Sequence, residues 1–483
     1  MKSFFVFCLI FLLSFNASSQ DIVLDFECDQ KSRQIKKYTF SLSNSLNGDL
    51  AILIRENKKF HAYLFDETFK PKSQLDFESE KKNRFNELLG YTIKESEYSL
   101  IYSNSFKNKF FAQTVDFSNN TSELKEIKLE FEGEKYLKTI SHNNNLYVLS
   151  STRDNDLIIR LLNNDYEFET VKKHALELDE KQKLQSSSLS FLNFDLSSNK
   201  QTSNITKIDN RVPNSLETTS NDNKIFNDEN NLYLTFDNNT ESTLMYIINL
   251  SDFSLEKKEF IYPKGRVDDY KNYNSYYLDG FLFQIASSNK EMTFVIRNLE
   301  GALLNLFYFD KDTAIDIKNT EIVQEKEVFL PFDGERSFEE TSKFLRKISS
   351  GKLGLSVYKK ADGYHLTIGG VKEFKGSGLG AGPMTSTTLG TNSRGQVIPI
   401  TTFNPTYSGY SSYSTTKSIY FNTKLNFDFN YIKEEVSTTV FEKIEEYKEG
   451  LKYISAEDVF FHNDELLFGY FNMKAGRYKL VKF

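Results

Sequence analysis

The chain has 483 residues, of which 39% are hydrophobic and 26% charged, an ordinary composition for a protein with a hydrophobic core. Its net charge of -7 argues against a nucleic-acid partner, because proteins that bind nucleic acids usually carry a basic face. With only 2 cysteines, the chain has neither a disulfide scaffold nor a cysteine-based zinc site.

Residues 1–19 predict a secretory signal peptide. Lys2 gives a basic start, the run from Phe4 to Phe15 is apolar apart from Ser14, and small residues follow at 17–19. The run is too short for a transmembrane helix, which needs about 20 residues. We therefore expect an exported protein with no transmembrane segment in the mature chain. Cys28 is then the remaining cysteine, and we expect it to be buried and inert.

The compartment follows from this segment and from the composition. An abundance of Asn, Lys, Ile and Phe is typical of AT-rich genomes, which together with the signal peptide suggests a bacterium. We expect the protein in the periplasm or at the outer-membrane surface of a Gram-negative cell.

Seven hairpins recur along the rest of the chain. Each consists of two short strands rich in Tyr, Phe, Ile, Val and Leu with a polar turn between them. Several of the hairpins start 48 or 49 residues apart, and four short strands in roughly 40–50 residues is the period of a β-propeller blade. Their first strands are Leu50–Arg55, Tyr98–Ser103, Leu146–Ser151, Leu232–Asp237, Phe281–Ala286, Leu353–Tyr358 and Leu466–Phe471.

The sequence thus predicts an all-β fold, a β-propeller of about seven four-stranded blades over residues 20–483. A pair of β-sandwiches is the alternative. The blade count stays open between six and eight, because Ser188–Ser197 has the composition of a further blade. Asn199–Asn223 is polar and predicts a long loop or an insert between blades.

Ring closure and a few helices complete the predicted fold. Asp21–Glu27 alternates as a strand does, and we expect it to close the ring beside Arg477–Phe483. Short helices are predicted at Ser79–Leu89, Phe338–Ile348 and Val440–Leu451, with polar strands and turns as the alternative for all three.

Gly376–Thr416 departs from the composition of the chain. It carries one charge, Arg394, and three of the 7 prolines, so it predicts an insertion loop within the sixth blade. Loops of this length are usually functional or disordered. Apolar residues and spaced tyrosines suit burial against another protein, and we expect the loop to project from the ring and to bind a partner. The predicted partner-binding residues are Val397, Ile398, Ile400, Phe403, Tyr407, Tyr410 and Tyr413.

Motifs for catalysis, metals and cofactors are missing from the sequence. The 5 histidines are scattered without ligand spacing, the glycines after 376 do not fit a phosphate loop, and there is no GxSxG elbow. Asp310 and Asp312 fit a solvated turn better than a calcium loop. We therefore expect no cofactor and no catalytic site, and an enzyme is the less favoured class.

Two hypotheses for function remain. The first is a non-catalytic binding or scaffold protein of the bacterial cell envelope, which docks another envelope protein or an outer-membrane complex through the insertion 376–416. The alternative is a secreted glycan-active hydrolase or lectin that uses the propeller face. Acidic side chains converging at the ring axis would favour the enzyme, whereas an axis lined by Lys, Asn or apolar residues would favour the scaffold.

Overall fold

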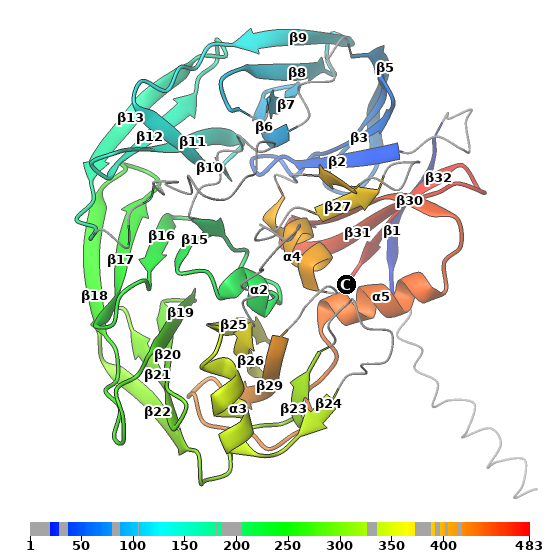
Figure 1. Cartoon of the computed structure of the whole chain (residues 1–483). Helices are drawn as coiled ribbons and strands as arrows, with labels where there is room; N and C mark the ends of the chain where they lie inside the picture. Colours follow the sequence, from blue (N-terminus) through cyan, green and yellow to red (C-terminus); the bar gives the residue numbers. More distant parts are fainter. Residues whose placement is uncertain are drawn as a thin grey trace, which may run out of the picture.

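A computed structural model describes residues 20–28, 37–79, 87–104, 106–179, 182, 184, 205–325, 336–371, 388–391, 397–400, 404–413 and 418–483. Seven sheets, antiparallel apart from one short inner strand, are arranged around an axis as the blades of a β-propeller (Figure 1), which confirms the predicted fold class and blade count. The predicted signal peptide and Ser188–Ser197 lie outside the described residues.

The first five blades each hold four strands that follow one another from the axis outward, and blade four has a fifth, inner strand. Blade one holds β2 (Lys37–Ser43), β3 (Leu50–Glu56), β4 (Lys59–Phe65) and β5 (Pro71–Glu78). Blade two holds β6 (Glu87–Lys94), β7 (Glu97–Ser103), β8 (Phe110–Asp116) and β9 (Thr121–Ile127). Blade three holds β10 (Glu134–His142), β11 (Asn145–Thr152), β12 (Asp156–Leu162) and β13 (Phe168–Ala175).

Blades four and five continue this order. Blade four holds β14 (Thr206–Lys207), β15 (Asn223–Asn227), β16 (Asn231–Phe236), β17 (Ser242–Asn249) and β18 (Leu255–Ile261). Blade five holds β19 (Asn272–Leu278), β20 (Phe281–Ser287), β21 (Glu291–Asn298) and β22 (Leu303–Asp310). Each of the seven predicted hairpins is present as two neighbouring strands within its own blade.

Blade six has a different strand order. Its outer strands come first in the chain, and the inner ones follow after a helix, in the spatial order β24-β23-β29-β26-β25. The elements are β23 (Ile322–Gln324), β24 (Arg336–Phe338), α3 (Thr341–Ile348), β25 (Lys352–Lys360), β26 (Gly363–Val371) and β29 (Ser418–Leu425). The insertion lies between β26 and β29, within blade six.

Blade seven closes the ring. It holds β30 (Ile454–His462), β31 (Glu465–Asn472) and β32 (Arg477–Lys482), and its outer strand is β1 (Ile22–Glu27) from the start of the described chain. β1 pairs antiparallel with β32, with Asp25 opposite Lys479 and Glu27 opposite Arg477. The predicted closure is therefore confirmed. Cys28, directly after β1, is 4% exposed, as expected.

The predicted helices have mixed outcomes. Two are present, as α3 and as α5 (Val440–Glu449), and α5 begins with Thr439 and Glu442 in a capping box that satisfies free backbone donors. The helix predicted at Ser79–Leu89 is wrong where it is described, because residues 87–89 belong to β6, so the alternative of a strand holds there; residues 80–86 lie outside the described chain. The polar stretch 199–223 includes a short helix, α2 (Leu216–Thr219), which lies inside the ring (Figure 1).

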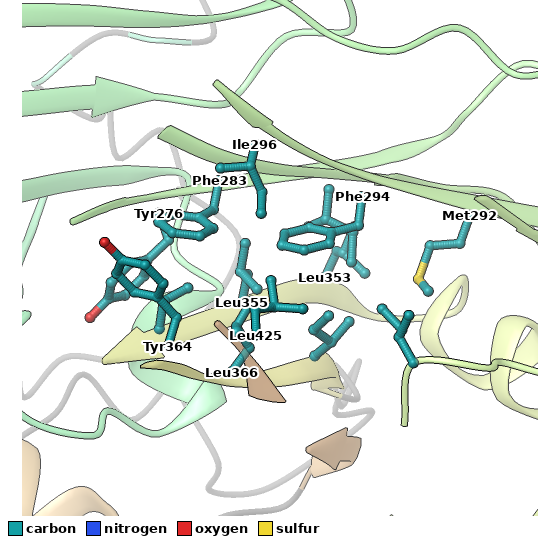
Figure 2. Close-up of a cluster of buried hydrophobic side chains, with 14 of the residues drawn as sticks. Tyr276, Phe283, Met292, Phe294, Ile296, Leu353, Leu355, Tyr364, Leu366 and Leu425 are labelled. Atoms are coloured by element: carbon teal, nitrogen blue, oxygen red, sulfur yellow. The ribbon is translucent and has the colours of Figure 1, made fainter. Parts of the chain in front are cut away.

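Alternation of side chains along the strands builds the core. In β3, Ala51 and Leu53 pack toward blade two, whereas Leu50, Ile52 and Ile54 pack toward blade seven. Both faces of this strand are apolar because each blade is covered on two sides. The same arrangement joins blades two and three, blades three and four, and blades four to six. In Figure 2 Phe283 and Phe294 of blade five meet Leu353 and Leu355 of blade six.

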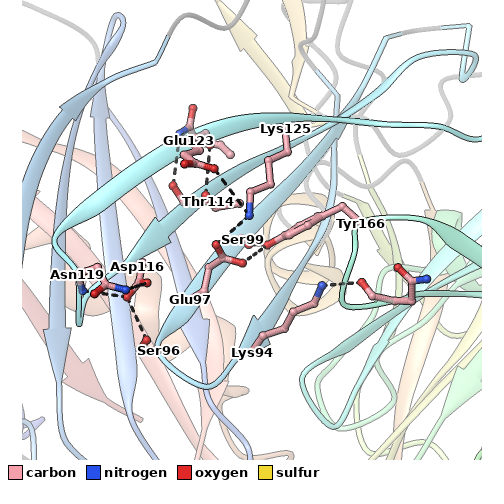
Figure 3. Close-up of polar contacts among 12 residues, drawn as sticks. Lys94, Ser96, Glu97, Ser99, Thr114, Asp116, Asn119, Glu123, Lys125 and Tyr166 are labelled. Atoms are coloured by element: carbon pink, nitrogen blue, oxygen red, sulfur yellow. Dashed lines mark hydrogen bonds and ion pairs between the residues drawn. The ribbon is translucent and has the colours of Figure 1, made fainter.

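Polar side chains add specific contacts between blades. Figure 3 shows Tyr166 of blade three, whose hydroxyl lies at Glu97 and Ser99 of blade two. Lys94 and Lys125 place their ammonium groups 4.0 Å and 4.6 Å from the centre of the Tyr166 ring. Burial, together with Glu97, raises the pKa of Tyr166, so the ring remains a neutral hydrogen-bond donor between two cations.

The junction between blades six and seven is filled by helices, and we call it the seam. Its apolar cluster holds blade-seven residues, residues of α5 and of the insertion, and Val212, but no residue from the strands of blade six among those described. Figure 1 shows α5 in the space between the two blades. The buried members are Val212, Tyr410, Phe441, Ile444, Val459, Leu466, Phe468, Tyr470 and Val481.

The sequence of blade six explains the seam. In β25, Leu353, Leu355 and Val357 pack into the core shared with blade five. The alternate residues are Gly354, Ser356 and Tyr358, and the same face of β26 carries His365 and Thr367. A face of small and polar groups gives little apolar surface for another sheet to cover. Leu216 of α2 instead packs against Gly354, where a Cβ atom would lie 3.1 Å from the leucine side chain.

Candidate functional site

The predicted partner-binding residues fall into three groups in the structure. Val397, Ile398 and Ile400 lie in β28 (Val397–Ile400), which pairs antiparallel with β27 (Thr388–Thr391). Phe403 lies outside the described residues. The three tyrosines lie in a helix, α4 (Pro405–Tyr413).

The start of α4 is fixed by its own sequence. The Asn404 side-chain oxygen accepts hydrogen bonds from the backbone N–H groups of Thr406 (3.0 Å) and Tyr407 (3.4 Å), as an N-cap residue does. Pro405 occupies the first helical position, where its fixed φ suits a helix and no N–H is needed. The sequence predicted a loop here, because the insertion as a whole is long, rich in glycine and proline and nearly free of charge.

The tyrosines of α4 pack inside the protein. Tyr410 is 6% exposed, and its ring lies 5.4 Å from that of Phe441 in α5. Tyr413 lies 5.6 Å from the same ring, and Tyr407 packs against Tyr410. The expectation that the insertion projects from the ring is therefore wrong for α4, because blade six leaves the seam open and the tyrosines fill it.

A second segment enters the ring at its axis. Residues 205–222 contact the inner strands of four blades. The backbone of Ile208 bonds to Ile225 of β15 in blade four. Asn214 bonds to Tyr276 of β19 in blade five and to Ser356 of β25 in blade six, and Arg211 lies 3.9 Å from the ring of Phe461 of β30 in blade seven. As predicted, this segment is an insert in the chain, between β13 of blade three and β15 of blade four. That the insert lies at the axis was not predicted, since composition does not tell a surface loop from one that fills a ring.

Asp209 joins this segment to the insertion. Arg211 donates from Nε and Nη2 to the two carboxylate oxygens, at 2.9 Å each, and Thr406 of α4 donates from its hydroxyl at 2.6 Å. Burial alone would raise the pKa of Asp209, but Arg211 and Thr406 hold it below its ordinary value. This carboxylate is thus an anchor for α4, fully occupied by protein donors.

Asp458 of β30 meets α4 from blade seven. It accepts from the backbone N–H of Ser41 at 3.2 Å and from the Asn404 amide at 3.5 Å. Burial raises the pKa of Asp458 to about 6, and no cation in the described part of the chain is paired with it to offset this. The two axial carboxylates therefore both hold the first turn of α4.

Histidines take part in local contacts rather than in a shared site. His61 bonds to Asp76 at 2.8 Å, His365 to Asp362 at 2.9 Å and His462 to Ser43 at 2.7 Å. No group of three or more His, Cys, Asp or Glu side chains is arranged to hold a metal within the described part of the chain. Asp310 accepts from the backbone N–H groups of Asp312 and Thr313, which makes the predicted solvated turn.

A polar pocket lies between blades three and four. It has a volume of about 210 Å³ and is lined by residues of three turns, at 142–147, 229–230 and 249–251. Amides predominate, and Glu229 is its single lining carboxylate. Amide and carboxylate groups around an aromatic residue, here Tyr147, suit a neutral ligand rich in hydroxyl groups. The sequence carried no signal for this pocket, since its residues are ordinary turn residues.

The fold and these sites define a seven-bladed β-propeller in which residues 205–222 enter the ring at its axis and helices fill one junction between blades. No family model matches the chain, and a search of curated proteins found no match. None of the helices among the described residues is long and apolar enough to cross a membrane.

Solved structures give distant likenesses. One, from an analysis of two prolyl endopeptidases, is 10% identical over 93% of this chain and 50% of the other, with a TM-score of 0.35. An oligogalacturonate lyase in complex with manganese is 9% identical over 93% of this chain and 96% of the other, with a TM-score of 0.28. This chain spans half the length of the first protein, and at these identities and TM-scores no argument about function follows.

Proposed function

We propose that this protein is a non-catalytic binding protein of the bacterial cell envelope that docks another envelope protein through its insertion. The support for export is the leader-like sequence of residues 1–19. The support for binding rather than catalysis is the ring axis. There, residues 205–222 and α4 contact the inner strands. Two axial acids, Asp209 and Asp458, accept hydrogen bonds from Thr406 and Asn404 at the start of α4.

The docking element is the hairpin β27–β28. The tyrosines of α4 are engaged in the seam, so the proposed contact falls to the other predicted residues in a described element, Val397, Ile398 and Ile400 of β28. A two-stranded sheet also offers backbone donors and acceptors to an added strand. The insertion then has two parts with separate roles: α4 fills the ring, and the hairpin meets the partner.

Site-specific crosslinking tests this proposal. A photoreactive amino acid replaces Ile398 in the full chain, and crosslinked envelope proteins are identified by mass spectrometry. A matched probe replaces Leu304, an exposed residue at 41% on the outer strand of blade five. We expect one envelope protein crosslinked at 398 and not at 304. Binding of that protein, measured with purified components, is then lost in the double variant Ile398→Asp, Ile400→Asp. The same products at both positions, or binding unchanged in the variant, would overturn the proposal.

The pocket between blades three and four favours a second candidate, a glycan-binding protein. Glycoside hydrolysis commonly uses a pair of carboxylates, and this pocket is lined by one, Glu229. The pocket therefore supports binding of a sugar more than its cleavage. Binding to immobilised oligosaccharides that is lost in Glu229→Ala and in Asn230→Ala, and kept in the control Glu126→Ala on β9, would support this candidate. Binding that is equal in all four proteins would exclude this pocket.

A further inference from the structure

Two lysines on the inner strands of blades three and four have no partner among the residues that the structure describes. Lys138 lies in β10, the innermost strand of blade three, and Lys207 lies in β14, which runs parallel to β15 and inside it. Both are half-buried. Neither ammonium group forms an ion pair or hydrogen bond with any residue that the structure describes, whereas Lys107 nearby is bound to Glu87 and Ser103.

A β-bulge directs Lys138. In the pairing of β10 with β11, Tyr136 lies opposite Ser150 and Lys138 opposite Leu149, so Leu137 is an extra residue. Leu137 packs in the core toward blade four, and the hydroxyl of Thr139 bonds to Leu89 of blade two. In a bulge, two successive side chains lie on the same side of a strand. Lys138 therefore shares the side of Leu137, toward blade four and Lys207.

Blade two provides a comparison for this position. It has the same bulge, with Leu88 and Gly90 on either side of the extra residue Leu89. Gly90 corresponds to Lys138, and a Cβ atom there would lie 2.5 Å from a methyl group of Leu146 in blade three. The next blade thus leaves no room at Gly90, whereas at the same point of blade three the structure accommodates a lysine. A long side chain at this position is therefore specific to the junction between blades three and four.

The charges around these lysines do not balance. The pKa of Lys207 is lowered to about 8, chiefly by burial; Asp209 opposes this shift, and Arg211 and Lys138 add to it. Asp209 is already bound by Arg211 and Thr406. Burial also lowers the pKa of Lys138. Placing two like charges near each other away from bulk water is costly unless an opposite charge accompanies them.

We propose that Lys138 and Lys207 bind a small oxyanion, a phosphate or carboxylate group, at the ring axis between blades three and four. Each lysine donates hydrogen bonds to one oxygen of the anion, and the anion supplies the charge that the described residues lack. This site is independent of the docking proposed for the hairpin, since it lies on other blades.

Calorimetric titration of the full chain in a low-salt buffer tests the site. Inorganic phosphate and glucuronate serve as separate probes, so that the two chemistries are distinguished. We expect at least one of them to bind, and the affinity to fall by about tenfold or more in Lys138→Met and in Lys207→Met. Lys138→Arg keeps the charge and should keep most of the binding. Lys172→Met on the outer strand of blade three should bind like the wild type.

Thermal unfolding without added anion gives a second readout. If the two lysines repel each other, Lys138→Met raises the melting temperature, whereas a lysine with a structural role would lower it. Failure of both anions to bind the wild-type protein, or unchanged affinity in Lys138→Met and Lys207→Met, would overturn the proposal. If one methionine variant does not fold, the anion affinities of the other methionine variant and of Lys138→Arg are compared with the wild type instead.

Discussion

Blade seven contacts its two neighbours in different ways, at its junction with blade one and at the seam with blade six. Toward blade one, Leu467 and Tyr478 of blade seven face Leu50 and Ile52 directly, sheet against sheet. Toward blade six, Phe468 and Tyr470 face helices and a segment from the axis. The difference arises in the neighbouring sheets: β3 is apolar on both faces, whereas β25 is apolar on one. A propeller can thus replace one sheet contact by helices if these supply the missing apolar surface.

The largest effect is expected from removing the insertion. Replacing residues 376–416 by two glycines takes away α4, so that Tyr410 no longer covers Phe441 and the face of blade seven. We expect the ring to lose cooperative unfolding, measured by circular dichroism during heating. Replacing only residues 388–400 by a Gly/Ser linker keeps α4 and should leave the melting temperature nearly unchanged. A cooperative transition at the wild-type temperature after the full deletion would show that the seam is not part of the core.

Removal of residues 20–28 tests the closure. The change removes β1, including Phe26, whose ring lies 4.6 Å from Tyr63 and 5.7 Å from Tyr478. It also exposes an unpaired edge at β32. We expect a loss that is a large part of the ~5–15 kcal/mol typical of folded domains. Urea unfolding measures it, and a loss below about 1 kcal/mol would show that blade seven is stable with three strands.

Two phenylalanines allow a direct comparison of seam and sheet core. Phe441 in α5 is 1% exposed, and Phe421 in β29 is fully buried beside Phe344. Truncation of a buried phenylalanine to alanine typically costs about 3–5 kcal/mol. We expect costs in this range for both Phe441→Ala and Phe421→Ala in urea unfolding. If Phe441→Ala costs less than about 1 kcal/mol, the helices fill space without stabilising the ring.

Asp458 links the seam to pH. Its pKa of about 6 in the folded protein exceeds the ordinary value of about 3.9 in an unfolded chain. The folded state therefore binds more protons between these values, and stability falls as the pH rises from about 4 to 6. We expect Asp458→Asn to remove this part of the pH dependence and to stabilise the protein at pH 7.5 by on the order of 2 kcal/mol. Urea midpoints at several pH values measure it, and an unchanged slope would contradict the assignment.

The smallest effect is expected at Cys28. Burial raises the pKa of its thiol to about 12, so the reactive thiolate is scarce at neutral pH. We expect slow labelling of the native protein by a maleimide, and Cys28→Ala to cost about 1 kcal/mol because it removes one small buried group. Denatured protein is the control, since it should react at once. Rapid labelling of the native protein would show that this end of β1 opens.

Much of the fold could be predicted from the sequence, because hairpin strands with apolar residues on both faces are a local signal. Runs such as Leu50–Arg55 and Phe281–Ala286 show this pattern without any knowledge of their neighbours. The strand order of blade six could not be predicted in this way, since β23 pairs with β29, far along the chain. Pairing between distant segments leaves no local pattern.

The candidate sites were less predictable. The tyrosines at 407, 410 and 413 indicated burial against another surface, but the sequence did not show that this surface belongs to the same chain. One clue was present in Leu353–Tyr358, where Gly354 and Ser356 interrupt the pattern of the other hairpins. Lys138 carries no signal of its own, because its position depends on a bulge that only the pairing of two strands reveals.

The pairing of β1 with β32 has a consequence for the order of folding. Blades one to five consist of strands that follow one another closely, so their contacts form with little loss of chain entropy. The contact of Asp25 with Arg477, by contrast, joins positions 452 residues apart. Contacts between positions so far apart in the sequence form late in folding, and until then β32 presents a free edge to other chains. The refolding protein is therefore most prone to aggregate just before its last strand pair forms.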